Sequence, residues 1–392
     1  MVSMMRKILI LALMLCLVLS GCGWMDRSYS SVTPHQQPSQ SQSVGGLRAS
    51  DYPQLCRVLE QMISSGTETA VINVSDYDPA GVDRGMELAA RYARISYPIG
   101  AYAVESISYE VGSSGGAPAI AVKIVYGRSK MELSRIRKAA DMDGAAVLIG
   151  SALDRCEAGI VILVDSYTSM DLAQLVQDYG LSNPDTIMEI PQVTEDIYPS
   201  SGKQRVLDLK FTYQTSREDL RQMQSQVKPV FEAAALYVSG DGAQRQKYTQ
   251  LYAFLMERFA EYQIKTSITP SYSLLRHGVG DSRTFAMVYG EMCRRAGLSC
   301  RIVVGTKAGE PWFWNMIEDG GYYYHVDLLR CQSEGGFRML TDAQMESCVW
   351  DYSAYPQCQG VPPTPVIPET QPATQPPEET AGSGETVPEN KN

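Results

Sequence analysis

The sequence predicts an α+β fold in which a repeated α/β region precedes a separate C-terminal domain of helices and strands. Residues 121–142 (AVKIVYGRSKMELSRIRKAADM) and 206–227 (VLDLKFTYQTSREDLRQMQSQV) share one pattern, in which alternating apolar residues are followed by apolar residues at helical spacing. After about residue 241 this pattern gives way to a long helix, a loop, a second helix and three strands. The change of pattern separates the two parts.

Residues 1–22 are typical of a secretory signal. Arg6 and Lys7 precede an apolar run that is too short to remain as a membrane-spanning helix. The ending LSGC at residues 19–22 resembles the lipobox of bacterial lipoproteins. That resemblance implies that Cys22 carries lipid, and that the mature chain is exported and anchored to the cell membrane on its extracellular face. An ordinary cleaved signal with an incidental cysteine is the alternative.

Both ends of the mature chain contain few apolar residues that could be buried in a core. Residues 23–46 are rich in Ser, Gln, Pro and Gly and are predicted to form a flexible tether, and residues 359–392 are predicted to be a disordered tail rich in Pro, Thr and Glu. The net charge of -10 is spread along the chain, and no block of Lys or Arg stands out. This distribution argues against nucleic acid as a partner.

The folded part of the chain has an odd number of cysteines, so at least one thiol is left without a disulfide partner within the chain. Of the nine cysteines, Cys16 lies in the signal and Cys22 at the lipid site, so seven remain in the folded part. An exported chain permits disulfides. Because Cys331, Cys348 and Cys358 are close in sequence, a bridge among them is plausible, although the sequence does not define the pairing.

The repeated α/β region is expected over residues 47–240, with copies at about 47–157 and 158–240. In each copy a serine is followed three residues later by an acid, Ser129 by Glu132 and Ser216 by Asp219. This spacing predicts a cap at the start of an amphipathic helix.

Each copy also has an upstream strand and helix. Strands are predicted from Thr69 and from Gly159, with helices around residues 86–93 and 170–179. The predicted plan is therefore strand, helix, strand, strand, helix in each copy. Glycine-rich loops such as the one from Val111 could bind a ligand or could simply turn the chain.

The C-terminal domain is expected over residues 241–358. The segment HGVGDSRTFAMVYGEMCRRAGLSC at residues 277–300 reads as a loop, a helix and the start of a strand, and further strands follow as PWFWNMIEDG and GYYYHVDLLR. These residues resemble the bacterial transglutaminase-like domain, a papain-like α+β fold. In that family a cysteine heads the central helix, and a histidine and an aspartate follow on neighbouring strands.

The resemblance assigns a role to three positions, and two of them have changed. The nucleophile position is Ser282, the base position is Trp312 and the orienting carboxylate is Asp327. A serine depends on a general base more than a cysteine does, and an indole nitrogen can only donate a hydrogen bond. The combination indicates that the family reaction is absent.

Two other interpretations concern the same residues. His325 lies two residues before Asp327 on a predicted strand and is an alternative base for Ser282, or it packs beneath the site as an ordinary strand residue. His277 is expected in the exposed loop. Asp281 and Ser282 are both suitable helix caps, so the serine could be kept for helix stability alone.

Aromatic residues line the expected cleft. Trp314, Asn315 and Tyr323 are candidate ligand contacts for a peptide, protein or glycan of the cell envelope, although aromatic residues of this kind are more often core. Alternation places Trp312 and Trp314 on one face of their strand. No metal-ligand spacing or nucleotide motif is present, so no metal or cofactor is expected.

The sequence thus favours a cell-surface lipoprotein whose degenerate transglutaminase-like domain serves binding or assembly. The alternative is an active hydrolase or acyl-transferase that uses Ser282 as its nucleophile. A third hypothesis places the function in the repeated region, with the last domain as a structural cap.

Overall fold

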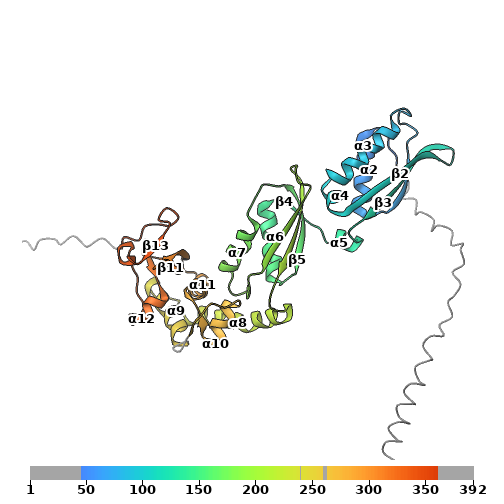
Figure 1. Ribbon diagram of the computed structural model, residues 1–392. Coiled ribbons are helices and arrows are strands. Elements are labelled where there is room, and N and C mark those ends of the chain that lie inside the picture. The colour runs from blue at the N-terminus through green and yellow to red at the C-terminus, as the bar shows by residue number, and fades with distance from the viewer. Residues whose placement is uncertain (1–45, 239, 259–262, 361–392) are drawn as a thin grey trace, which may run out of the picture. The chain divides into compact units, whose positions relative to one another are not determined.

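A computed structural model describes residues 46–238, 240–258 and 263–360 of the chain (Figure 1). The predicted leader with Cys22 lies outside these residues, as does nearly all of the predicted tether and tail. Within the described ranges, no helix is long and apolar enough to cross a membrane. Helices and strands are mixed throughout, which confirms the predicted α+β class.

The first α/β segment is built on a three-stranded antiparallel sheet. Its elements are α2 (Tyr52–Ser65), β1 (Thr69–Asn73), α3 (Val82–Ile95), α4 (Pro98–Ala103), β2 (Val104–Ser114), β3 (Ala117–Tyr126) and α5 (Lys130–Ser134). The sheet order is β1-β3-β2, so the hairpin of β2 and β3 places β3 in the centre. Apolar side chains of the helices and of the sheet form one core.

The second α/β segment follows a similar order, with an added first strand and without a counterpart of the short helix α4. Its elements are β4 (Arg137–Asp141), α6 (Met142–Asp154), β5 (Gly159–Ser166), α7 (Leu172–Ser182), β6 (Gln192–Tyr198), β7 (Arg205–Thr212) and α8 (Arg217–Tyr237). The sheet order is β4-β5-β7-β6, in which β5, β7 and β6 repeat the arrangement of β1, β3 and β2. That the two segments are copies of one unit stays a prediction.

The predicted capping serines begin helices in both segments. Ser129 forms a complete capping box with Glu132 at the start of α5, and the Ser216 side chain accepts the N–H of Asp219 at the start of α8. The helices differ in length, with 5 residues in α5 and 21 in α8. The extra turns of α8 carry apolar residues such as Phe231 into the core of the C-terminal domain.

The chain divides into two compact units. The first unit contains residues up to Ala145 with Ile160–Ser169 and Asp196–Asp208, and the second contains Ala146–Gly159, Met170–Glu195 and the residues from Leu209 onward. The apolar face of α8 packs into the same core as helices of the C-terminal domain, and residues from Leu209 onward fall in the second unit.

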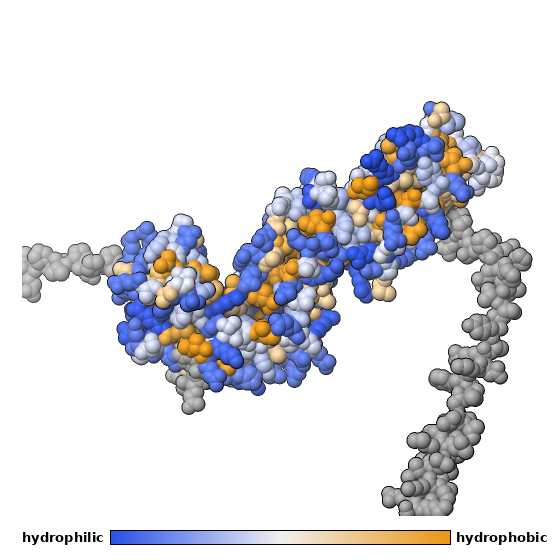
Figure 2. All heavy atoms as spheres, viewed as in Figure 1, coloured by the Kyte–Doolittle hydropathy of each residue, from blue (hydrophilic) through white to orange (hydrophobic). Residues whose placement is uncertain are grey.

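The C-terminal domain surrounds one central helix. Its elements are α9 (Gln244–Arg258), β8 (Gln263–Ile264), α10 (Pro270–His277), β9 (Val279–Gly280), α11 (Ser282–Arg295), β10 (Cys300–Lys307), β11 (Glu310–Asp319), β12 (Tyr322–Val326), α12 (Leu328–Ser333), the 3-10 helix η2 (Asp342–Met345) and β13 (Cys348–Trp350). The three strands predicted after the central helix are confirmed as β10, β11 and β12, in a sheet of order β12-β11-β10-β13. Figure 2 shows that apolar residues reach the surface in patches among hydrophilic ones.

A buried carboxylate holds α11 in place. Glu291 is 3% exposed, and its carboxylate accepts hydrogen bonds of 2.6 Å from the Nε atoms of Arg294 and Arg295. Arg295 also pairs with Asp185, which follows α7. The network ties the C-terminal end of α11 to the second α/β segment and leaves its N-terminal end facing β11.

Candidate functional site

The N-terminus of α11 is capped by Asp281. Its Oδ1 accepts the backbone N–H of Thr284 at 2.9 Å and the hydroxyl of Thr284 at 2.7 Å. Ser282 is the first helical residue and makes no capping bond. Of the two caps that the sequence allowed, the structure uses Asp281, so capping does not account for the serine.

Ser282 lies against β11 with little access to solvent. The residue is 7% exposed, and its Oγ accepts the backbone N–H of Phe313 at 3.3 Å. In the part of the chain that the structure describes, no histidine nitrogen is bonded to this oxygen. A nucleophilic serine depends on such a partner to lose its proton, and in the bond that Ser282 makes with Phe313 its oxygen is the acceptor.

The indole of Trp312 is hydrogen-bonded to Asp327, the residue to which the family resemblance assigns the orienting role. Its Nε1–H donates to Oδ2 of Asp327 at 2.9 Å, and Asp327 is 1% exposed. In a catalytic triad, an imidazole donates to the carboxylate with one nitrogen and accepts a proton with the other. Because an indole has no second nitrogen, this pair preserves the contact of a triad without its proton transfer.

Lys307 compensates the buried carboxylate of Asp327. Its Nζ lies 3.6 Å from Oδ2 and 4.6 Å from the centre of the Trp312 ring. The other oxygen, Oδ1, accepts the N–H of Arg330 at 3.1 Å and caps α12. Asp327 is thus fully used in structural contacts.

Lys307 was not among the residues expected at this site, although the short turn that follows it gives a signal. Ala308 and Gly309 both have positive φ, 54° and 84°, and form the two-residue turn between β10 and β11. A hairpin at that turn pairs Lys307 with Glu310 and Gly305 with Trp312. Since alternate residues share a face, the turn would have placed the lysine beside the tryptophan.

His325 is engaged by partners other than Ser282. Its Nδ1 accepts the Nε1–H of Trp314 at 2.9 Å, and its Nε2 lies 2.9 Å from Oδ1 of Asp342. Because tryptophan can only donate, we assign the ring proton to Nε2, which then donates to Asp342. Neither nitrogen remains for Ser282. Of the two interpretations of His325, the geometry therefore fits the one in which it packs beneath the site as an ordinary strand residue.

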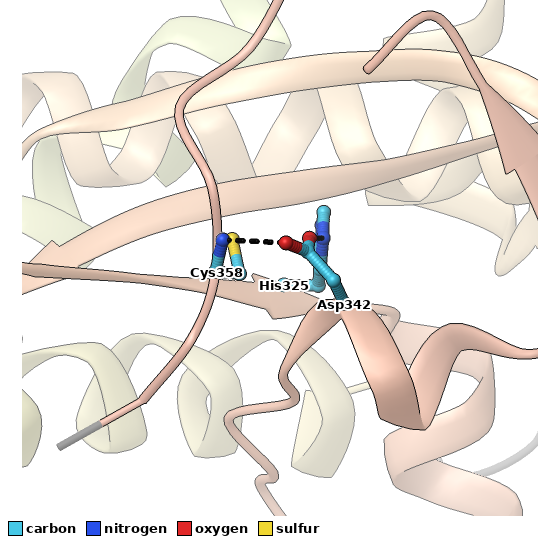
Figure 3. Close-up of side chains that lie close together, drawn as sticks. All are labelled: His325, Asp342 and Cys358. Carbon is cyan, nitrogen blue, oxygen red and sulfur yellow. Dashed lines mark hydrogen bonds and ion pairs between the residues drawn. The ribbon is translucent and has the colours of Figure 1, made fainter. Parts of the chain in front are cut away.

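His325, Asp342 and Cys358 form the one cluster of possible metal ligands among the described residues. Figure 3 shows Asp342 between the other two, and the three ligand atoms lie within 4.8 Å of one another. Oδ2 of Asp342 accepts the backbone N–H of Cys358 at 2.9 Å, and burial raises the pKa of the Cys358 thiol to about 12.

The hydrogen bonds around His325 do not suit a metal. A metal at Nε2 would require the ring proton on Nδ1, where it would meet the N–H of Trp314. The thiol of Cys358 would also have to ionise against its raised pKa. We therefore assign the three residues as a hydrogen-bonded cluster that links the end of the domain to β12.

Because this cluster contains a buried histidine, we expect the folded chain to lose stability in acid. Burial of His325, only partly offset by Asp342, lowers the pKa of the imidazole below its ordinary value of about 6.5. The unfolded chain then binds more protons, so the stabilising contribution is complete above pH of about 6.5 and is lost as pH falls toward the folded pKa. We expect urea midpoints of the full chain to fall between pH 7 and 5, and His325→Gln to flatten this part of the profile. Equal slopes in the two proteins would contradict the assignment.

The expected aromatic cleft is closed in the structure. Trp314 is 1% exposed and Asn315 is fully buried, with its Nδ2 donating to the carbonyl of Ala286 at 2.9 Å. The space that Ser282, Asn315 and Asp327 line does not admit a water molecule. Trp314 and Asn315 are thus placed in the core and not on a ligand-facing wall, whereas Tyr323 is partly exposed.

Two smaller expectations differ from the structure. His277 is exposed as expected, but it ends α10 and packs its ring against Tyr272 at 5.3 Å instead of lying in a loop. Cys331, Cys348 and Cys358 are free thiols, so the bridge considered among them is not formed. All three side chains are instead buried in apolar core.

Comparisons with known proteins agree with the position of this domain. Residues 232–338 match the transglutaminase-like superfamily, so the match begins within α8 and ends before η2. No curated protein matches the chain.

Three solved structures show a limited likeness to the chain. They are a candidate cysteine protease from Cytophaga hutchinsonii (12% identity, 41% of this chain and 70% of that chain, TM-score 0.24), a TGase (10%, 56% and 63%, 0.22) and a candidate protease from Parabacteroides distasonis ATCC 8503 (9%, 66% and 39%, 0.22). The chain therefore spans less than two thirds of the second and third of these structures.

Proposed function

We propose that this chain is an exported lipoprotein whose transglutaminase-like domain has lost catalysis and serves binding or assembly at the cell envelope. The observation that carries the proposal is the hydrogen bond from Trp312 Nε1 to Asp327. This bond fills the base position with a side chain that cannot accept a proton. The domain keeps the fold of the site, and the side chains at the catalytic positions contribute to its stability.

The chemistry of acyl transfer explains why this replacement is decisive. The nucleophile must be deprotonated as it attacks, and a positioned general base contributes about 10²–10⁴-fold to such a step. A serine at the helix N-terminus has a far less acidic proton than a cysteine, so it depends on that base more strongly. Ser282 faces a backbone N–H, and Trp312 faces a carboxylate.

The alternative of an active hydrolase requires a base that the described residues do not offer. His325 was the candidate, and both of its nitrogens are committed to Trp314 and Asp342. The void that Ser282 and Asp327 line also has no room for a water molecule. These contacts support the non-catalytic proposal over the alternative.

The test of lost catalysis compares the full chain with Ser282→Ala on a panel of peptide amides, glutamine-containing peptides and activated esters. We expect the two proteins to show the same background rates on every substrate. Turnover that the wild type shows and the variant lacks would contradict the proposal.

The closed space beside Ser282 limits where a partner could bind. A closed crevice excludes an extended chain from the former catalytic groove. We therefore place the contact with a peptide, protein or glycan of the envelope on the outer surface of the chain, where the α/β segments remain an equal candidate. Deleting the transglutaminase-like domain, that is, the chain after residue 240, tests this choice. Envelope binding that survives the deletion would favour the α/β segments.

The export part of the proposal rests on the leader sequence. The apolar run and the LSGC motif at residues 19–22 support lipid on Cys22 and a membrane as its anchor. Growth of an expressing bacterium with labelled palmitate should label the chain and leave Cys22→Ser unlabelled. An unlabelled wild-type chain would reject the lipid anchor and leave the account of the site unchanged.

A further inference from the structure

The sheet of the first α/β segment has one long edge without a neighbouring strand. Its order, β1-β3-β2, places β1 and β2 at the two edges. At the edge of β1, the N–H of Asn73 donates to the carbonyl of Leu47, and its carbonyl accepts the N–H of Ala49. Among the described strands β2 pairs with β3 alone, and it runs for 11 residues. A row of free backbone groups on such an edge is a template for pairing with another strand.

Backbone hydrogen bonds of β3 show which residues of β2 face outward. The N–H of Ile124 donates to the carbonyl of Glu68 beside β1, so even-numbered residues of β3 bond away from β2. The register sets Ile107 opposite Ile124, so odd-numbered residues of β2 point their N–H and C=O away from β3. The carbonyl of Glu105 accepts a hydrogen bond from Arg94 at 3.4 Å, and the free stretch begins after it. In the part of β2 that follows, four residues have outward backbone groups that bond to no other described residue: Ile107, Tyr109, Val111 and Ser113.

The side chains along this edge alternate between apolar and polar. Ile107 and Tyr109 pack against the core of the segment but stay partly exposed, and Val111 is 48% exposed. Ser108 and Glu110 are exposed on the opposite face of the strand. The apolar row is half-covered because no strand follows β2. Both the backbone and the apolar row therefore end where a further strand would continue them.

We propose that β2 pairs antiparallel with β2 of a second copy of this chain, about a two-fold axis at Tyr109. The side-chain pattern from Ile107 to Val111 is symmetric about this residue, in the order apolar, polar, apolar, polar, apolar. Pairing about Tyr109 therefore sets Ile107 opposite Val111 on the core face. On the other face it sets Ser108 opposite Glu110, whose carboxylate can accept the serine hydroxyl. The inference goes beyond the proposed function and does not depend on it.

The neighbouring positions of the axis are less favourable. An axis at Glu110 would place two like charges directly opposite each other. An axis at Ser108 would set the apolar Val111 opposite the charged Glu105. The axis at Tyr109 avoids both arrangements and joins two three-stranded sheets into one sheet of six strands.

Sedimentation velocity of the full chain tests the pairing. We expect the average mass to rise from that of one chain toward that of two as the concentration increases from about 1 µM to about 100 µM. Val111→Lys should weaken this dimer by roughly tenfold or more, because each dimer contains the substitution twice. The matched control is Val71→Lys, which should leave the dimer unchanged, since Val71 is similarly exposed, at 45%, but lies on β1 at the other edge.

The two lysine variants share every other segment of the chain, so association through any other segment is common to both. Variants that associate equally would overturn the proposal. A wild type that stays monomeric over this range would also overturn it and would leave the edge of β2 to a strand of another protein.

A cysteine on the two-fold axis tests the register. Tyr109→Cys should form a disulfide-linked dimer with oxidised glutathione, since opposed residues of a hydrogen-bonded pair lie about 5.5 Å apart between Cα atoms, within disulfide reach. Val111→Cys, two residues from the axis, should not link to itself. Trypsin releases both positions on residues 95–123, which contain no native cysteine, so mass spectrometry identifies the link. Equal linkage in the two variants would overturn the assigned axis.

Discussion

Combining Ser282→Cys with Trp312→His is expected to produce a thiol that reacts with iodoacetamide at pH 6 roughly 10 to 100 times faster than Ser282→Cys alone. Asp327 already accepts a hydrogen bond from Trp312, so an imidazole introduced at residue 312 would find a carboxylate in place to orient it. The imidazole and the N-terminus of α11 would both lower the pKa of the introduced thiol.

The reaction can be followed on a single peptide. Trypsin releases residues 277–283 with the introduced thiol, apart from every other cysteine of the chain. Adding Asp327→Asn to the double variant is the matched control and should return the rate toward that of Ser282→Cys. A double variant that folds with the circular dichroism of the wild type, yet reacts no faster than the single variant, would show that Trp312 does not occupy the base position.

Trp314→Ala is expected to lower the free energy of unfolding of the C-terminal domain by about 3–5 kcal/mol. The indole is 1% exposed, packs edge-on against Trp350 at 5.5 Å between ring centres, and donates to His325. The substitution leaves a cavity and a buried imidazole nitrogen without its donor. Urea unfolding followed by circular dichroism measures the loss.

A second substitution separates the packing of Trp314 from its hydrogen bond. Trp314→Phe keeps an aromatic ring and removes the N–H, and should cost roughly 1–3 kcal/mol because Nδ1 of His325 loses its partner. Tyr352, which is 59% exposed, is the surface control, and Tyr352→Ala should cost less than about 1 kcal/mol. Equal costs for Trp314→Ala and the control would mean that Trp314 does not hold the core.

Local structure could be predicted well from the sequence because it depends on near neighbours. The caps at Ser129 and Ser216, the helix after Asp281 and the strands around Trp312 each follow from spacing or from short-range hydrogen bonding. The three positions that the family resemblance singled out lie next to one another, since Ser282 bonds to the residue after Trp312 and Trp312 bonds to Asp327.

Partners across the sheet could not be predicted in the same way. The bonds of His325 to Trp314 and to Asp342 depend on strand register and on how the chain returns after α12. The charge of Lys307 reaches Asp327 only once the β10–β11 hairpin is formed. Periodicity shows which residues are buried, but it does not show which buried polar groups satisfy one another.

The domain boundary near residue 240 stays a prediction. The pattern change there is real in the sequence, but α8 continues with apolar residues such as Phe231 that are buried among α9, α10 and α11. A helix that ends one sequence pattern can still belong to the next core. The superfamily match, which starts at residue 232, agrees with this packing.

The most direct test of lost catalysis is covalent labelling of Ser282 by an aryl fluorosulfonyl probe in the folded full chain. Trypsin isolates this serine in residues 277–283, and mass spectrometry reads the modified fraction. The account predicts no more label on this peptide in the folded protein than in urea-unfolded protein. Label that appears only in the folded chain, and that His325→Gln removes, would show an activated serine and contradict the loss of catalysis.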